Sequence, residues 1–516
     1  MTLGHAPRQG DLLDDITRFC DRALSETSIY SFLHRERDQL FPDEFFDDLF
    51  VDIGRRSVPP SVVATVMVLQ RLEGLSDREA AERFTFDSRW RYAAGVGGYD
   101  GEGRLSFVHT VLVDMRARLR ESKRPDRVFE VTRETASAAG LIGRKRVLDS
   151  TPLYDAVTTM DTITLIRTAL RGLLAEAGDL EPAMRRACTS GDDYTDSAKP
   201  RINWDDAAER DALIDSRARD AYACLAILDG RKLEDELARA AELLATVVGQ
   251  DLDEGDDGTF RIARRVAKNR IISTVDTDAR HGHKTSAKGF DGYKGHISLD
   301  PDSEIVTETV VTAGNVGDAE AADEVLDECL PPREEASTGG DAVESEPMGI
   351  YGDAAFGSGP ILARLAAAGA TAMVKVQPPV NTGGRFTKSD FVIDLDGRTV
   401  QCPNGITVDI APKKDGGGFA RFGGACGACP LRMHCTTAKA GRQIGIGPHE
   451  ALLARERERQ RDPAWRTEYR QTRPKVERKL GHMMFRRHGG RRARVRGLRR
   501  VAQDFSWPVT RIGAGS

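Results

Sequence analysis

Two aspartates stand where short apolar runs of the chain end. Asp353 follows the run 348–352 (MGIYG) and precedes a glycine-containing turn and a helix-like segment, 360–368. Asp149 follows the run 145–148 (KRVL) and precedes small residues in the same way. We expect both strands to stop at the aspartate, and in open α/β sheets chemistry collects at the carboxyl ends of strands. Each carboxylate is thus placed either to act at a sheet edge or to cap the turn that follows it.

Glu477 is a third acidic residue in an unusual setting. It lies among cations in the segment 465–480 (WRTEYRQTRPKVERKL), where Tyr469 and Arg473 precede it at intervals of four residues and share its helical face. Pro474 cannot donate a helical hydrogen bond, so we expect a helix to begin or kink there, with Glu477 in its first turn. The carboxylate either forms ion pairs within the helix or ligates a metal on a phosphate-binding surface.

Four of the eight cysteines cluster in the last quarter of the chain. Cys402, Cys426, Cys429 and Cys435 are spaced C-x23-C-x2-C-x5-C. Four thiolates in this pattern can enclose a tetrahedral structural zinc ion, with His434 as an alternative ligand. The surrounding sequence is rich in glycine and poor in apolar residues, so a metal would help it to fold. The alternatives are reduced thiols or a redox pair.

Length and charge limit the classes of protein to which these residues can belong. The chain of 516 residues predicts about three structural units. Its apolar runs are far shorter than the ~18–20 residues of a membrane span, and no signal peptide is evident, so we expect a cytoplasmic protein without a membrane partner. The net charge is −5, but residues 466–500 hold 14 Lys and Arg against two Asp and Glu, a net charge of +12. This asymmetry predicts a segment that binds a polyanion.

The N-terminal part of the chain is predicted to be helical. Helix 61–72, a break that contains glycine, and a second helix opened by a capping box at 76–79 outline a helix-turn-helix. Arg89 and Arg91 follow, interleaved with aromatic residues, and are predicted DNA contacts. The alternative is an ordinary helical bundle with a solvated basic face.

Strand-like and helix-like segments alternate in the rest of the chain. A strand at 270–276, a basic loop at 278–293, a hairpin at 294–313 and buried strands at 348–352 and 371–376 follow the strand before Asp149. Together they predict a mixed α/β core with helices on the sheet faces. The predicted units are 1–125 (helical, DNA-binding), 140–155 with 266–395 (α/β core), 156–265 (acidic helical insertion), 396–445 (four-cysteine insertion) and 446–516 (basic C-terminal helices).

Five motifs, taken in order, resemble the DDE transposases of bacterial insertion sequences, in the branch with an N-terminal helical domain and a cysteine-rich insertion. They are VLDST around Asp149, FDGYKGH with TAGNVGDA (290–296 and 312–319), YGDAAF around Asp353, CGACPLRMHC (426–435), and YRQTRPKVE ending at Glu477. The resemblance implies an RNase H-like core in which Asp149 and Asp353 end adjacent central strands and Glu477 comes from a later helix. Alternative choices for the acidic site are Asp155, Asp276, Asp278 and Asp318.

The surroundings of Glu477 depart from the pattern of this family. Tyr469 and Arg473 are one residue further apart than is usual. Met484 stands where a downstream lysine is usual, and Arg486 or Arg487 would have to replace it.

The resemblance implies a transposase that binds the terminal inverted repeats of its element, cleaves, and joins the 3′ ends to target double-stranded DNA, acting as a homodimer. Such chemistry needs a clamp on the attacking and leaving oxygens, which two Mg²⁺ ions (or Mn²⁺) held by carboxylates provide. A DNA-binding derivative without activity, or a metal-dependent nuclease without strand transfer, are the alternatives. The predicted DNA contacts are Tyr469, Arg470, Arg473, Lys475, Arg486, Arg487, Lys284, Lys288, Lys294, Arg89 and Arg91.

Overall fold

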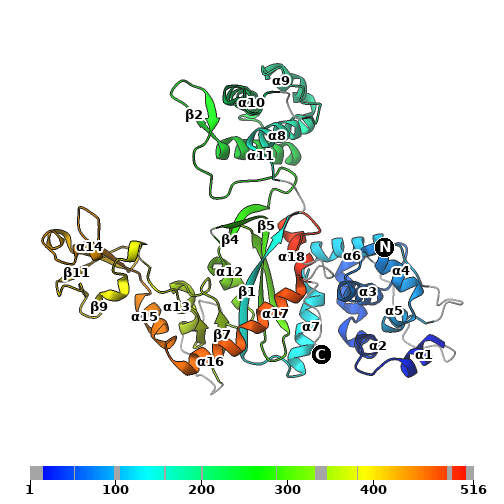
Figure 1. The fold of residues 1–516 in the computed structure, drawn as a ribbon. Helices are drawn as coiled ribbons and strands as arrows, with labels where there is room; N and C mark the ends of the chain where they lie inside the picture. Colours follow the sequence, from blue (N-terminus) through cyan, green and yellow to red (C-terminus); the bar gives the residue numbers. More distant parts are fainter. Residues whose placement is uncertain are drawn as a thin grey trace.

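A mixed β-sheet forms the centre of the molecule (Figure 1). The computed structural model describes residues 15–51, 53–97, 105–155, 159–198, 202–285, 287–331, 346–380, 382–484 and 491–506. The strand order is β4–β5–β1–β7–β8, and β6 also pairs with β5. Strands β4, β5, β6 and β1 pair in antiparallel fashion, whereas β1, β7 and β8 are parallel. The strands are β1 (Lys145–Tyr154), β4 (Arg280–Thr285), β5 (Lys288–Leu299), β6 (Val306–Ala313), β7 (Gly349–Gly352) and β8 (Thr371–Val374). The predicted mixed α/β class is confirmed.

Helices cover both faces of this sheet because side chains alternate along each strand. Leu148 of β1 packs in an apolar cluster with α12 (Asp318–Leu326), α13 (Gly359–Ala367) and α15 (Glu450–Arg459). Its neighbour Val147 packs in a second cluster on the other face. The helices of that face are α16 (Pro463–Thr472), α17 (Pro474–Met483) and α18 (Leu498–Ser506), joined by Phe129 of α7 (Arg127–Ala138).

Strand β1 does not stop at Asp149, as the sequence predicted, but continues to Tyr154. Its antiparallel partner β5 pairs with it from Val147 to Tyr154, so the strand continues past Asp149. Strand β7 leaves β1 after Val147, so the other edge is open from there. Pro152 is tolerated because residues 150, 152 and 154 direct their backbone nitrogens to that open edge: the N–H of Ser150 bonds to the Asp149 carboxylate, and that of Tyr154 bonds to Arg491.

Two further predictions need correction. The basic segment 278–293, expected to be a loop, forms most of the β4–β5 hairpin. The run 270–276, expected to be a strand, has no regular secondary structure, although Ile271 and Ile272 are buried. The hairpin predicted at 294–313 is confirmed as β5–β6.

The N-terminal helices form a bundle with its own apolar core. Helix α3 (Pro60–Glu73) is buried at every residue from 60 to 70. It ends at Gly74, whose φ of 69° favours glycine, and α4 (Asp77–Phe86) begins with the predicted capping box of Ser76 and Glu79. The other helices here are α1 (Asp15–Ala23), α2 (Ile29–Leu40), the 3-10 helix η1 (Asp43–Leu49), α5 (Ser88–Ala93) and α6 (Thr110–Glu121).

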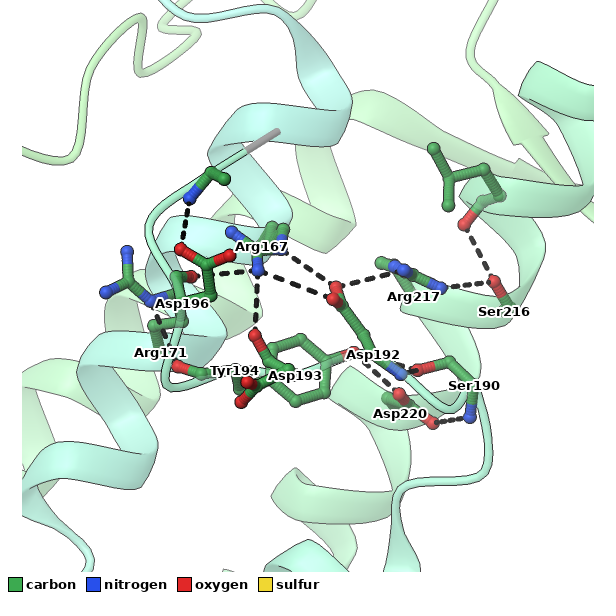
Figure 2. Close-up of polar contacts among 12 residues, drawn as sticks. Arg167, Arg171, Ser190, Asp192, Asp193, Tyr194, Asp196, Ser216, Arg217 and Asp220 are labelled. Carbon is green, nitrogen blue, oxygen red and sulfur yellow. Dashed lines mark hydrogen bonds and ion pairs between the residues drawn. The ribbon is translucent and has the colours of Figure 1, made fainter. Parts of the chain in front are cut away.

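A helical insertion follows β1 and stands beyond the end of the sheet where β4 and β5 meet (Figure 1). It has its own apolar cluster. Figure 2 shows the polar network that fixes its irregular segment 188–198: Asp192 pairs with Arg167 and Arg217 at 2.8 and 3.0 Å, and Tyr194 donates to Asp220 at 2.6 Å. Its elements are α8 (Thr162–Glu176), η3 (Gly178–Leu180), α9 (Glu181–Ala187), α10 (Ala207–Leu228), α11 (Asp235–Asp251), β2 (Leu252–Glu254) and β3 (Phe260–Ile262).

The cysteine-rich segment folds around a five-stranded antiparallel sheet that the sequence did not predict. Its strands are short, and turns rich in glycine join them. The elements are η4 (Thr382–Gly384), η5 (Lys388–Asp390), β9 (Val392–Asp394), β10 (Thr399–Gln401), β11 (Thr407–Pro412), β12 (Gly418–Arg421), η6 (Gly423–Cys426), α14 (Arg432–Cys435) and β13 (Gln443–Ile446). In the described ranges of the whole chain, no helix has the length and apolarity that a membrane crossing requires.

The buried carboxyl of Glu308 on β6 predicts a pH dependence of stability. Burial raises its pKa from 4.5 to about 7, against the opposing charge of Arg133 at 3.3 Å. The folded state therefore binds more protons than the unfolded state, so stability falls as pH rises from 4.5 to about 7. We expect Glu308→Gln to remove this fall and to raise stability at about pH 8, by at most about 3 kcal/mol.

Urea unfolding of both proteins at about pH 5 and about pH 8 measures the effect. Glu134→Gln, at a side chain that is 62% exposed, is the control. An unchanged pH dependence in Glu308→Gln would contradict the expectation.

Candidate active site

The pairing of β1 with β7 brings Asp149 and Asp353 to the same edge of the sheet. Val147 lies opposite Tyr351 in this parallel ladder, and each aspartate comes two residues later in the chain, Asp149 within β1 and Asp353 directly after β7. Both side chains are partly exposed. The negative charge of Asp353 contributes to a raised pKa at Asp149, so the two carboxyl groups lie within electrostatic reach of each other.

Asp149 is largely enclosed, with 15% of its side chain exposed. Its Oδ1 accepts a hydrogen bond from the N–H of Ser150 at 2.8 Å and lies 3.0 Å from Nη2 of Arg473. Burial raises the pKa of this carboxyl, and Asp353 adds to that effect, whereas Arg473 and the Ser150 N–H oppose it. The Arg473 guanidinium is thus the main group that keeps a buried negative charge at Asp149 tolerable.

Asp353 caps the turn that follows β7. Its Oδ1 accepts a hydrogen bond from the N–H of Ala355 at 2.8 Å. The two interpretations of this residue are therefore compatible, because a carboxylate with one oxygen bound to a turn still presents a second oxygen at the sheet edge.

Helices α16 and α17 bring Tyr469, Arg473 and Glu477 against this edge. The predicted break is present, since α17 begins at Pro474. Arg473 lies between two of the acidic residues, with its Nη1 at 3.6 Å from Oε1 of Glu477. The Glu477 side chain is 64% exposed and extends outward, whereas Arg473 is buried.

Tyr469 fastens α16 to the end of β7. Its hydroxyl donates to the carbonyl oxygen of Gly352, the residue before Asp353, at 3.1 Å. Its ring stacks on Trp465 with centroids 4.9 Å apart. Burial raises the pKa of Tyr469 to about 12; Asp353 and Glu477 add to the rise and Arg473 opposes it. The tyrosine therefore lies within electrostatic reach of all three charged groups.

The carboxylate set has the chemistry of a hard-cation site, but its arrangement is open. Oxygen donors from Asp149, Asp353 and Glu477 suit Mg²⁺ or Mn²⁺. Across the described residues, however, no three His, Cys, Asp or Glu side chains come close enough together to hold a metal ion. A guanidinium cation from Arg473 lies between Asp149 and Glu477 instead.

The four clustered cysteines line one small cavity of about 20 Å³, walled by aromatic residues that include Phe391 and Phe422. The backbone N–H of Arg442 donates to Sγ of Cys426 at 3.4 Å. Burial raises the pKa of the Cys435 thiol; the other three cysteines add to the rise and Arg442 opposes it. The donors converge on one space, although not at metal-binding distances, and His434 is not among the residues that line it.

Several predicted DNA contacts are occupied by interactions within the protein. Arg91 is 1% exposed and donates to the carbonyl oxygens of Gly97 and Leu105, so this prediction is wrong. Lys294 is also an incorrect choice, because it pairs with Asp318 at 3.1 Å and donates to a backbone carbonyl. Tyr469 and Arg473 are buried in the acidic site and do not belong to the outer surface.

The other predicted contacts differ in accessibility. Arg470, Lys284 and Lys288 are exposed. Arg89 is bound to Asp87 at 2.6 Å, and Lys475 lies 3.4 Å from Asp302. Arg486 and Arg487 lie outside the described residues.

The C-terminal arginines lie beside the open edge of β1, a position that the sequence did not predict. Residues 491–493 pair with the open edge of β1: the N–H of Tyr154 donates to Arg491 O at 3.0 Å, and the N–H of Ala493 donates to Tyr154 O at 2.9 Å. Asp276 and Asp278, alternative choices for the acidic site, instead accept hydrogen bonds from the backbone at the start of α18. The alternation of arginine with small or apolar residues in RARV (492–495) is a local pattern typical of an extended segment.

Two family models match parts of the chain. The one described as "Transposase domain (DUF772)" matches residues 18–118, and the one described as "Transposase DDE domain" matches residues 401–510. No curated protein and no solved structure matches the chain. The second match includes Glu477 and the four clustered cysteines, and both aspartates precede it. The chain is thus similar to a transposase DDE domain over residues 401–510 and to a transposase domain over residues 18–118.

Proposed function

We propose that this protein is a transposase that cleaves and joins DNA at a site formed by Asp149, Asp353 and Glu477. The substrate is double-stranded DNA at the terminal inverted repeats of a bacterial insertion sequence, and the active form is a homodimer on paired ends. One observation carries the proposal: the β1–β7 register brings two aspartates together, and α17 adds a glutamate through Arg473.

The core belongs, on this proposal, to the RNase H-like class. Asp149 stands on β1, Asp353 directly follows the adjacent strand β7, and the glutamate comes from a later helix, as expected for that class. The strand order β6–β5–β1–β7–β8, antiparallel on one side of β1 and parallel on the other, is in keeping with it.

The residues of the proposed site have different roles in phosphodiester chemistry. The three carboxylates would hold Mg²⁺, which when bound activates the attacking hydroxyl and stabilises the leaving oxygen. Ser150 orients Asp149 by donating its N–H, and Ala355 does the same for Asp353. Tyr469 ties α16 to Gly352, so the helix that leads to Glu477 keeps its place relative to Asp353. Such pre-orientation matters because misplacement of about 1 Å can cost on the order of a hundredfold in rate.

A track of arginines next to this edge would bind the DNA backbone. Six of them, at positions 491, 492, 494, 496, 499 and 500, are exposed, and none forms an ion pair with a carboxylate of the described chain. Residues 491–493 pair with Tyr154, so the track begins beside β1, the strand that contains Asp149. From there it leads to α18, which contacts α6 of the N-terminal bundle. A phosphate backbone on this track would therefore pass from the acidic site toward the N-terminal helices.

The enzymatic proposal is tested with a labelled element end, Mg²⁺ and purified protein. We expect wild type to nick the end and join it to target DNA, and Asp353→Ala to lose both activities while its DNA binding changes little. Nicking without joining would favour a metal-dependent nuclease. Binding without nicking by wild type would favour a DNA-binding derivative and overturn the proposal.

The arginine track predicts a change in the salt dependence of DNA binding. Each phosphate contact contributes about 0.9 to the slope of log K against log salt. We expect the double variant Arg491→Gln and Arg492→Gln to lower this slope by about one to two. The pair Arg185→Gln and Arg186→Gln on α9, where Arg185 already pairs with Glu181, should leave it unchanged. Fluorescence anisotropy at several salt concentrations measures the slopes, and equal slopes for the two double variants would contradict the track.

The four clustered cysteines would hold a structural zinc ion. The support is their convergence on one cavity inside a segment with a small apolar core. A bound Zn²⁺ would stabilise the fold of this segment, whose own apolar core is small. Elemental analysis of the purified protein should find about one zinc per chain, and Cys429→Ser should lose it, whereas Cys329→Ser should not. Zinc content unaffected by Cys429→Ser would exclude this site.

A further inference from the structure

Arg473 is the one cation in direct contact with the acidic side chains of the described site. Its Nη2 lies 3.0 Å from Oδ1 of Asp149, and its Nη1 lies 3.6 Å from Oε1 of Glu477. The residue is 6% exposed. A buried guanidinium between two carboxylates supplies the positive charge that the site would otherwise lack.

This guanidinium is poorly satisfied where it lies. Nε and Nη1 of Arg473 are buried and have no hydrogen-bond partner among the described residues. Unmet donors on a buried charged group are costly, and the ideal partner of a guanidinium is a planar or tetrahedral oxyanion bound through two N–H groups. The arrangement therefore has unused capacity for an anion.

The position of Arg473 also accounts for the open arrangement of the carboxylates. One oxygen of Asp149 contacts the Arg473 guanidinium. Glu477 lies on the other side of that guanidinium, with most of the Glu477 side chain in solvent. A divalent cation and a guanidinium would compete for the same oxygen, because like charges at contact distance repel.

We propose that Arg473 is an exchangeable cation: it neutralises Asp149 in the free protein, yields that place to a divalent metal ion, and then binds a phosphate oxygen of the DNA at the site. The inference rests on the proposed function. Once Asp149 is committed to the metal, the phosphodiester is the anion left for the guanidinium. DNA would therefore tighten metal binding, and by thermodynamic reciprocity the metal would tighten DNA binding.

The exchange is tested by titrating Mn²⁺ into the free protein, without DNA, and measuring unbound Mn²⁺ by electron paramagnetic resonance. Mn²⁺ is chosen because the four thiols favour softer ions. Without its competitor, Arg473→Gln should bind Mn²⁺ at least about tenfold more tightly than wild type, or about 1.4 kcal/mol. Arg470→Gln removes the same charge three residues earlier, at an exposed position, and should stay within about twofold of wild type. Equal or weaker binding by Arg473→Gln would overturn the exchange, as would equal tightening in Arg470→Gln.

A second measurement uses wild type alone and covers the case in which Arg473→Gln does not fold. Crystals soaked in Mn²⁺ should show anomalous density at Asp149 and Asp353, with the Arg473 guanidinium displaced from Asp149. Density at the aspartates with the Arg473–Asp149 pair intact would overturn the exchange.

The proposed contact between Arg473 and a DNA phosphate is tested by the rate of DNA cleavage. Arg473→Gln should bind metal more tightly and yet cleave DNA more slowly, whereas cleavage at the wild-type rate would exclude a phosphate contact.

Failure of the exchange can be distinguished from failure of the proposed function. If wild type shows metal-dependent cleavage but Arg473→Gln has unchanged Mn²⁺ affinity, the exchange alone is wrong. If wild type and Asp353→Ala behave alike with DNA and Mn²⁺, the proposed function itself is wrong.

Discussion

Strand β1 is the constraint on which the rest of the core depends, because its two edges are used so differently. One edge is paired with β5 for almost its whole length, which makes the strand rigid. The other edge is paired with β7 for three residues and is then open until Tyr154. The open stretch is where Asp149 stands, where the Ser150 N–H is free to orient it, and where residues 491–493 are added.

Electrostatics at this edge follow from burial. Asp149 is removed from water by the helices on its face of the sheet, and a buried carboxylate is stable only with a cation or hydrogen-bond donors beside it. Arg473 supplies the cation from the junction of α16 and α17, which Pro474 sets in place. A divalent ion would meet the same requirement with a larger charge. In the free protein, the negative charge of Asp149 is therefore already balanced by the Arg473 cation.

The insertions carry apolar cores separate from that of the sheet. The helical insertion has one cluster, stabilised by the Arg167–Asp192–Arg217 network, and the cysteine-rich segment has another (Figures 1 and 2). Separate cores allow each unit to be added to the chain without repacking the sheet. On the proposed function, the chemistry thus remains with β1, β7 and α17, and the added units can differ without altering that site.

The sequence by itself determined the features that depend on near neighbours along the chain. The capping box at Ser76, the helix start at Pro474 and the β5–β6 hairpin were all predictable, because caps, proline and turns act over a few residues. The resemblance of the motifs around Asp149, Asp353 and Glu477 to one family also predicted that they act as a set, which is the basis of the proposed function.

Only the tertiary structure decided the length of β1, the inward position of Arg91, the pairing of Arg473 with Asp149 and the docking of the C-terminal arginines. A strand ends where its partner ends, and a cation faces inward only where folding has buried an acceptor. The partners of β1, of Arg473 and of the C-terminal arginines are distant in the chain, and the acceptors of Arg91, 6 and 14 residues away, are presented only by the folded segment, so local pattern does not identify these partners. The three acidic residues were predicted from the motifs that surround them, whereas the position of Arg473 beside Asp149 and Glu477 was decided by the fold.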